Sequence, residues 1–540
     1  MAATNQRKRQ HSGPAWAARG KLRLCHVAGG PAETARMLLS GEWDFTPGAL
    51  LSTSRYAAGL VEELAARKIS AVCLDWSAGF SHEGDRPQWE CARQLLPLLK
   101  KKRIKAIARI CLGRCFAAEL FRREPQAAAW LERDAAGQPL PLCQGHALRM
   151  APQNPGWRQY VAHKAAAAAE AGFNGLYFEN IEGKLAEAAE FIRNLRATVR
   201  GLQPLDEDEL LFCAQAPLLS PVTEACNLKC TRLPVSPGLQ PGGALSCNLP
   251  FLKLAFEDGG RDKLFAAGFS GAEFTPKARA LATAEILASG GICSDYDSLA
   301  EYSLFQAQNP ALFGQADAIN QAGLLLDEAE GGAGDTGDAS RLLARLNLQH
   351  DLIPVSQSRH FEFRKYRLLN ALHLSAPDKA LAEALQTFVR ENKGVLLISS
   401  QARDRLSLDA ADEERTEVAA GGGRIISYRA PTESRWQAEN YQRLVITDML
   451  KFCAQTVTVQ AVDGVLAQLW GKGTARWVHV LNYGDEPAGA TISLPGCGGR
   501  KLKVYSPDQR QPELKVLETG SATASFELTG LETYCIVEVA

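Results

Sequence analysis

The residue with the clearest chemical potential is an acid, Glu179, which stands where a short apolar run ends. That run, residues 176–178, has the length of a buried strand and follows an alanine-rich helical run that Gly172 ends. An acid at the point where a buried parallel strand emerges occupies the place where (β/α)8 barrels carry catalytic groups. Glu179 is therefore the first candidate catalytic residue, and its neighbours Tyr177 and Asn180 are candidates for substrate binding. The alternative is a strand that ends in a solvated acid, with Tyr177 packed in the core.

The segments around Glu179 alternate between strand-like and helix-like patterns, which predicts a parallel sheet covered by helices. Apolar runs of strand length lie at 22–27, 69–76, 104–112, 176–178 and 210–213. Amphipathic helical patterns lie between them, at 54–68, 88–102, 156–171 and 184–200. The alternating region, residues 21–315, fits a (β/α)8 (TIM) barrel of roughly 250 residues better than an open sheet. Within it, residues 216–250 are rich in Pro, Gly and Cys and read as long loops.

Two smaller domains are predicted after the barrel. Residues 316–455 combine strand-like runs with a helix at 378–392, which indicates a doubly wound, flavodoxin-like or amidotransferase-like α/β domain. From 456 to 540 the pattern changes to short alternating runs, which predict a small β-sandwich. Residues 1–20 are basic but contain no apolar core of a signal peptide, so a disordered tail is expected there.

The composition excludes several classes of partner. Lys and Arg together number 60, as do Asp and Glu, so the net charge predicts neither nucleic acid nor an anionic membrane as the main partner. No apolar run approaches the roughly 18 residues of a membrane span. The 14 cysteines lie mostly in apolar runs, as expected of buried thiols in a cytoplasmic protein. Cys226 and Cys230 lack a second ligand pair nearby, so neither zinc nor any cofactor is expected.

Several stretches, in this order, resemble one family of enzymes. They are the third-strand run 103–109, the Pro-Ala-Trp segment 124–130, the N-P-G-W-R-Q-Y run 154–160, the helix 282–291 that ends in Gly-Gly, and the V-H-V-L-N-Y strand 478–483. The chain resembles glycoside hydrolases allied to the beta-galactosidases that carry a trimerisation domain. The resemblance implies a (β/α)8 barrel, a glutamine-amidotransferase-like domain and a small β-domain. It also implies a carbohydrate substrate and a homo-oligomer, either a dimer or a trimer.

The sequence departs from that family at the fourth strand. Those beta-galactosidases carry Asn-Glu at the strand end, where the Glu is the general acid/base. Here the order is reversed, Glu179 before Asn180. In barrels specific for alpha linkages the corresponding strand ends in a nucleophilic Asp, a position that Glu179 also resembles. Both roles, acid/base and nucleophile, therefore stay open for Glu179.

Hydrolysis of a glycosidic bond usually requires a second carboxyl group, about 5 Å away for retention and ~6.5–9.5 Å away for inversion. The first candidate is Glu273, which follows a short strand-like run and precedes Pro276. Its alternative role is that of an acid at the start of a helix. The remaining candidates are Asp75, Glu224, Asp295 and Asp297.

Other residues at predicted strand ends could bind the sugar. Asp75 and the adjacent Trp76 end the second strand, where an indole could stack on the apolar face of a sugar. His26 ends the first strand, and Asp295 follows a plausible eighth strand. Both could bind a hydroxyl group. For each of these residues, packing, capping or a buried hydrogen bond is the alternative.

The middle domain lacks the residue that an amidotransferase needs. A catalytic cysteine should follow the strand 394–399, but residues 399–402 read Ser-Ser-Gln-Ala, so a non-catalytic domain is expected. The function indicated is hydrolysis of a glycosidic bond by paired carboxylates. The alternatives are a barrel that binds saccharides without cleaving them and an assembly protein. The sugar, the anomeric linkage and the stereochemical outcome stay open.

Overall fold

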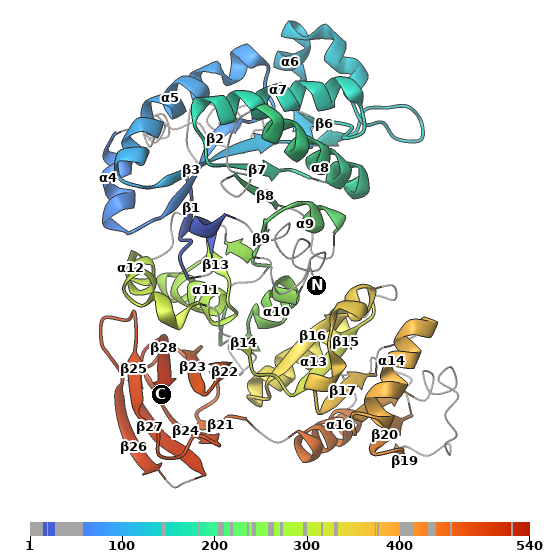
Figure 1. Cartoon of the computed structure of the whole chain (residues 1–540), viewed down its shortest axis with the longest axis vertical. Coiled ribbons are helices and arrows are strands. Elements are labelled where there is room, and N and C mark those ends of the chain that lie inside the picture. Colours follow the sequence, from blue (N-terminus) through green and yellow to red (C-terminus); the bar gives the residue numbers. More distant parts are fainter. Residues whose placement is uncertain are drawn as a thin grey trace. The chain divides into compact units, whose positions relative to one another are not determined.

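The computed structural model of the 540-residue chain divides into two units (Figure 1). Unit 1 comprises residues 1–232, 261–270 and 291–311, and unit 2 comprises residues 233–260, 271–290 and 312–540. The described residues are 14–18, 20–27, 58–142, 147–181, 183–202, 210–215, 220–234, 237–239, 245–257, 264–269, 274–294, 300–314, 317–328, 333–372, 374, 377–399, 415–429, 439–453, 456–519 and 522–540.

Unit 1 contains an eight-stranded parallel sheet, which confirms the predicted barrel. In sheet order its strands are β1 (Leu24–Val27), β2 (Ala71–Ser77), β3 (Lys105–Cys111), β7 (Gly175–Glu179), β8 (Leu211–Gln215), β9 (Leu228–Arg232), β12 (Leu264–Gly268) and β13 (Ile292–Cys293). The backbone N–H of His26 donates to Ser294 O at 2.9 Å, so the last strand returns beside the first and nearly closes the barrel. One expectation was wrong: residues 216–250 do not form only loops, because β9 lies among them.

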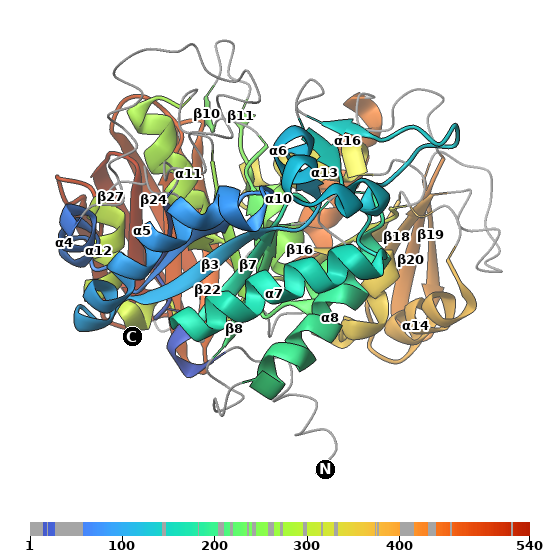
Figure 2. The same cartoon turned by 90° about the horizontal axis from the view of Figure 1, so that it is seen from above.

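Helices cover the outer face of these strands. Helices α5 (His82–Lys101), α7 (Pro155–Ala171) and α8 (Leu185–Leu202) lie along β3, β7 and β8 (Figure 2). Local chemistry sets the ends of α7: the Asn154 side chain accepts from the N–H of Gly156, and Gly172 leaves the helix at φ 100°. The other helices of unit 1 are α4 (Ala58–Ala66), α6 (Ala117–Arg123), α9 (Pro221–Ala225) and α12 (Ala300–Gln308).

The barrel interior is filled by side chains from alternate strand positions. The buried members of this inner layer are Ala17, Leu22, Leu24, Ala71, Cys73, Ile107, Tyr177, Leu211, Cys213, Leu228, Cys230, Ala266 and Ile292. Ala17 comes from the short helix η1 (Ala15–Ala17) and packs with side chains from the first residues of the strands. The barrel is therefore a packed core, and the carboxyl ends of its strands are left for function.

A small antiparallel sheet is inserted after β3. It consists of β4 (Arg114–Cys115), β6 (Ala147–Arg149) and β5 (Pro141–Leu142), and the insertion also contains η3 (Pro125–Trp130). Trp130, from the Pro-Ala-Trp segment, lies 5.5 Å from the Tyr160 ring and 6.3 Å from the Trp157 ring. Two stretches that carried the family resemblance therefore pack against each other.

Unit 2 contains a doubly wound sheet, as predicted for the middle of the chain. Its strand order is β16 (His350–Pro354), β15 (Ala322–Leu326), β17 (Leu368–Ala371), β18 (Val395–Ser399), β20 (Gly423–Tyr428) and β19 (Arg415–Ala420). All pairs are parallel except β19 with β20, and the order begins 2-1-3-4, as in flavodoxin-like folds. Helices α13 (Ala333–Arg345), α14 (Lys379–Arg390) and α16 (Glu439–Phe452) accompany the strands.

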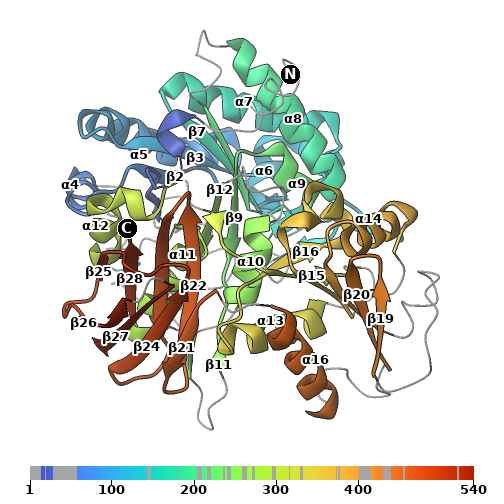
Figure 3. The ribbon, with the colours of Figure 1, turned by 60° about the horizontal axis from the view of Figure 1, so that its bottom comes forward.

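The C-terminal part is a β-sandwich, as expected (Figure 3). One sheet consists of β14 (Asp317–Ala318), β22 (Val465–Lys472), β23 (Ala475–Asn482), β28 (Tyr534–Val539) and β25 (Leu502–Tyr505). The other consists of β21 (Thr458–Ala461), β24 (Ala488–Pro495), β27 (Thr523–Leu531) and β26 (Glu513–Thr519). Apolar side chains from both sheets share one buried core.

Two helices from the range predicted for the barrel belong to unit 2, namely α10 (Leu249–Glu257) and α11 (Pro276–Ala288). The domain boundaries at 20, 315 and 455 stay predictions. Within the described residues, no helix has both the length and the apolar character that a membrane span requires. No disulfide joins the cysteines of the described segments.

Candidate active site

Three charged residues meet at the carboxyl ends of neighbouring barrel strands. Asp75 on β2 is the register partner of Arg109 on β3, and Glu179 is the last residue of β7, the fourth barrel strand. The Arg109 guanidinium bonds Asp75 Oδ1 through both Nε and Nη2, and its Nη1 lies 3.7 Å from Glu179 Oε2. Asp75 is 3% exposed and Glu179 is 8% exposed, so the surrounding protein screens little of this pairing with water. One cation therefore joins two carboxylates in a shielded place.

Strand alternation explains why Asp75 and Trp76 part company. Cys73 belongs to the inner layer of the barrel, so Asp75 lies on the same inward face, whereas Trp76 faces the helices. The Trp76 ring is fully buried and stacks on Trp89, with centroids 5.1 Å apart. Its Nε1 donates to Lys164 O at 2.9 Å. The expectation that Trp76 stacks on a sugar does not fit this position, because its faces are occupied by protein.

His26 and Tyr177 lie inside the barrel below the charged group. Their rings meet edge to face with centroids 4.7 Å apart, although β1 and β7 are not neighbours in the sheet, so the contact crosses the interior. The Tyr177 hydroxyl donates to Gln215 Oε1 at 3.0 Å, at the end of β8. Burial raises the pKa of Tyr177 well above its ordinary value, so it stays a neutral hydrogen-bonding group.

The backbone around Glu179 is held in an unusual conformation. Asn180 has φ 56°, in the left-handed region that few residues other than glycine adopt. Its carbonyl packs against Gly113, Leu112 N–H donates to Glu179 O at 3.0 Å, and Asn180 Nδ2 donates to Cys111 Sγ at 3.5 Å. The other described non-glycine residues with positive φ, which all follow helices, are Lys68, Arg103, Asn347 and Lys393. Strain of this kind, held in place by the surrounding structure, is typical of functional sites.

Two predicted site residues lie outside the described residues. Glu273 comes five positions after the last residue of β12, the seventh barrel strand in sheet order. Asp295 comes two positions after β13, the eighth strand. The structure therefore supports their positions in the chain, and their roles stay predictions.

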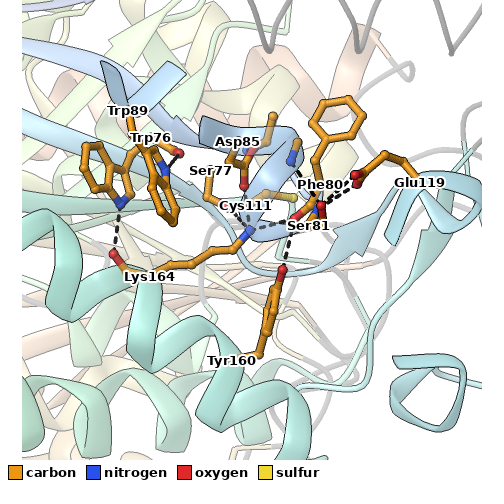
Figure 4. Close-up of polar contacts among 12 residues, drawn as sticks. Trp76, Ser77, Phe80, Ser81, Asp85, Trp89, Cys111, Glu119, Tyr160 and Lys164 are labelled. Atoms are coloured by element: carbon orange, nitrogen blue, oxygen red, sulfur yellow. Dashed lines mark hydrogen bonds and ion pairs between the residues drawn. The ribbon is translucent and has the colours of Figure 1, made fainter. Parts of the chain in front are cut away.

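A buried network fixes the turn that follows Asp75 (Figure 4). The Lys164 ammonium of α7 donates to Asp85 Oδ2 at 2.5 Å, Phe80 O at 2.7 Å and Ser77 Oγ at 3.1 Å. Asp85 is fully buried, and burial raises the pKa of its carboxyl group. The turn is held further by Ser81, whose hydroxyl donates to Glu119 Oε1 at 2.6 Å. This network is closed to solvent, so it supports the site from outside the barrel.

The chemistry available at the mouth of the barrel is that of carboxylates and a guanidinium. Among the described residues, no group of three or more His, Cys, Asp or Glu side chains could hold a metal ion. Arg109 was missed by the sequence reasoning, although a charged residue on the inward face of a buried strand is a usable signal. In unit 2, β18 ends at the buried Ser399, and the residues from 400 to 414 lie outside the described part. The amidotransferase-like identity of this domain and its catalytic silence stay predictions.

Solved structures share this architecture. A cold-adapted beta-galactosidase from a Rahnella species is similar with a TM-score of 0.65 at 11% identity, covering 96% of this chain and 98% of that one. Gan42B, a GH42 beta-galactosidase from G. stearothermophilus, gives 0.62 at 12% identity, covering 96% and 98%. The beta-galactosidase from Bacillus circulans sp. alkalophilus gives 0.63 at 10% identity, covering 96% and 99%.

No protein-family model matches the chain, and no curated protein matches its sequence. At such low identity the likeness to solved structures establishes the fold. It covers the barrel, the doubly wound domain and the β-sandwich together. The chain therefore has, over nearly its full length, the fold of the GH42 beta-galactosidases.

Proposed function

We propose that the protein is a glycoside hydrolase that cleaves a glycosidic bond with two carboxylates at the mouth of its barrel. The observation that carries the proposal is the inward cluster of Asp75, Arg109 and Glu179 at the carboxyl ends of β2, β3 and β7. Barrels of this type carry their catalytic groups at that end. The proposed substrate is an oligosaccharide or a simple glycoside, in keeping with the beta-galactosidases that share the fold.

The proposed role of Glu179 is that of nucleophile. A carboxylate close to a guanidinium is favoured in its charged form, and the Nη1 of Arg109 lies 3.7 Å from Glu179 Oε2. A charged carboxylate can attack an anomeric carbon, whereas a general acid must arrive protonated. Of the two roles that the sequence leaves open, the ion pair therefore favours the nucleophile.

The proposed general acid is Glu273. Asp75 is bonded to Arg109 as well, so its carboxylate is also favoured in the charged form. Glu179 would attack the anomeric carbon while Glu273 gives its proton to the leaving oxygen, and the glycosidic C–O bond breaks. Glu273 would then take a proton from the water that hydrolyses the glycosyl ester, which restores both residues and retains the configuration. His26, Tyr177, Asn180, Asp75 and Asp295 are proposed to bind sugar hydroxyls.

The test begins with a panel of aryl glycosides and oligosaccharides, followed by Glu179→Gln and Glu179→Ala. We expect E179Q to lose at least about 10²-fold in turnover, while E190Q, which alters an exposed glutamate on α8, keeps wild-type turnover. Azide should restore cleavage by E179A and give a glycosyl azide of inverted configuration. An azide product of retained configuration would instead make Glu179 the acid/base. Normal turnover by E179Q would remove it from catalysis.

A barrel that binds saccharide without cleaving it is the alternative, because the order Glu179-Asn180 differs from that of the resembled family. Calorimetric binding of an oligosaccharide by the wild type, with no hydrolysis of any panel member, would establish this alternative. A cytoplasmic location and a dimeric or trimeric state also stay proposals. Light scattering of the purified protein tests the oligomeric state.

A further inference from the structure

One buried carboxyl group in unit 2 joins three separate segments of the chain. Glu285, on α11, is 0% exposed. Its Oε1 accepts from the backbone N–H of Asn248 at 2.8 Å and from the Tyr483 hydroxyl at 2.7 Å. Its Oε2 accepts from Asn248 Nδ2 at 2.8 Å. Asn248 directly precedes α10, and Tyr483 directly follows β23 of the sandwich. Glu285 therefore holds α11 to both of these elements.

Further contacts dock α11 on the β-sandwich along its length. In its first turn, the Lys277 ammonium donates to Glu532 O and lies 3.3 Å from Thr533 Oγ1. At its last residue, Ala288 O accepts from Trp470 Nε1 at 2.8 Å. Glu285 stands between these two points, so breaking its hydrogen bonds would weaken the middle of the interface.

The groups that face Glu285 supply hydrogen bonds but no opposite charge. Burial raises the pKa of the Tyr483 hydroxyl, and it raises the pKa of the Cys247 thiol, next to Asn248, to about 12. Both groups are therefore neutral at pH 7. The nearby cations have other partners: Lys253 of α10 donates to His350 O, Lys277 bonds Glu532 O, and Arg341 of α13 acts on Cys247. Burial outweighs the three donors and raises the pKa of Glu285 to about 7.

We propose that Glu285 is a proton-operated latch between α11 and the β-sandwich, tight when its carboxyl group is protonated and looser when it is ionised. A neutral carboxyl group satisfies its neighbours without the cost of a buried charge. An ionised one keeps three donors, but they do not offset the loss of water around a negative charge. Opening the interface hydrates Glu285, so ionisation favours the open form.

The direction and the pH window follow from the two pKa values. Closed, Glu285 has a pKa of about 7, and hydrated it returns to the model-compound value of 4.5. Between these values the closed form binds more protons than the open form, so raising the pH favours opening about tenfold for each pH unit. Over the whole window the opening constant should rise about 300-fold, and it should be flat below and above.

The test is hydrogen exchange of the α11 amides from pH 4 to 8, corrected for intrinsic exchange, in the wild type and in Glu285→Gln. Gln keeps the shape of the protonated acid but cannot ionise. We expect the ratio of wild-type to E285Q opening to rise about 300-fold across the window. Comparing the two proteins cancels other titrating groups, such as His350. The matched control is E383Q, the same change at a side chain 67% exposed on α14, which should leave α11 unaffected.

A second variant covers the case in which E285Q does not fold. Tyr483→Phe removes one donor to the carboxylate, so the pKa of Glu285 should rise and the window should move to higher pH. Infrared difference spectra of the wild type should show the carboxylic acid C=O band of Glu285 being lost near pH 7. Parallel exchange profiles in wild type and Y483F, or a carboxylate band already present at pH 5, would overturn the latch. None of these readouts depends on glycosidase activity.

Discussion

The main-chain oxygen of Asn180 lies only 1.7 Å from the place where a β-carbon on Gly113 would stand. Gly113 follows β3, and Asn180 follows β7, so the ends of two neighbouring barrel strands touch backbone to backbone. Since Glu179 directly precedes Asn180, the absence of a side chain at residue 113 allows the position of the candidate nucleophile. Gly113 therefore acts on the site without carrying any chemistry of its own.

This contact predicts that Gly113→Ala damages both stability and turnover. The added methyl group must push the end of β7 away, which we expect to cost about 1–3 kcal/mol of unfolding free energy. Displacing Glu179 by about 1 Å should lower turnover by about 10²-fold on any glycoside that the wild type cleaves. Thermal melting and steady-state kinetics measure the two effects. Gly59→Ala on α4, where no atom lies within 4 Å of the new β-carbon, should leave both unchanged.

The second prediction concerns the cation that joins the two acids. Arg109→Met leaves Asp75 and Glu179 buried without their guanidinium, and we expect a loss of about 3–5 kcal/mol at pH 7. Adding Asp75→Asn should recover part of that loss, because one of the stranded charges is removed. Urea denaturation of the two single variants and the double variant gives the coupling energy. Additive losses would mean that the pair contributes nothing to stability.

The fold could be predicted from the sequence because β-α alternation is a local signal. The run predicted at 176–178 is the centre of β7, and the run at 69–76 overlaps β2. The strand β9 was missed, since its residues, Leu228–Arg232, lie in a segment whose Pro, Gly and Cys content suggested loops. Tertiary pairing with β8 and β12 makes this segment a strand.

The site was predicted less well, because it depends on register. Which residue of β3 faces Asp75 is set by strand pairing, so Arg109 could not be identified from local pattern alone. The error over Trp76 was avoidable: adjacent residues of a strand face opposite sides, so Asp75 and Trp76 could not line one subsite. Lys164 lies in an alanine-rich helix, and its burial depends on Asp85, 79 residues away.

The third prediction tests that buried pair. Lys164 and Asp85 have side chains 2% and 0% exposed, so Lys164→Met leaves a buried, unpaired acid. We expect K164M to lose about 3–5 kcal/mol of unfolding free energy, and K164M with Asp85→Asn to lose less. Arg86→Met is the control, because Arg86 and Glu90 are 73% and 58% exposed, and such pairs contribute about 0–1 kcal/mol. Equal losses in K164M and R86M would contradict a structural role for the network.

The last prediction concerns the stability of unit 2 in acid. His350 and His479 are buried, and burial lowers the pKa of each to about 3. His350 Nδ1 lies 2.8 Å from Leu348 O, and Nε2 lies 2.7 Å from Ser340 Oγ, so the neutral ring can donate to the carbonyl and accept from the hydroxyl. His479 Nδ1 lies 2.7 Å from the Tyr534 hydroxyl, which a neutral ring also satisfies.

In the unfolded chain both rings take up a proton as the pH falls below their ordinary value of about 6.5. The folded state cannot do so until about pH 3, so stability should fall steadily between those values, by roughly 3 kcal/mol per histidine at pH 4. Denaturant melts of the wild type and of His350→Gln, at pH 7 and pH 4, measure the effect. The difference between the two proteins should shrink or reverse at pH 4, since H350Q no longer has a buried ring to keep neutral. A difference that stays constant from pH 7 to pH 4 would mean that His350 is already charged in the folded protein.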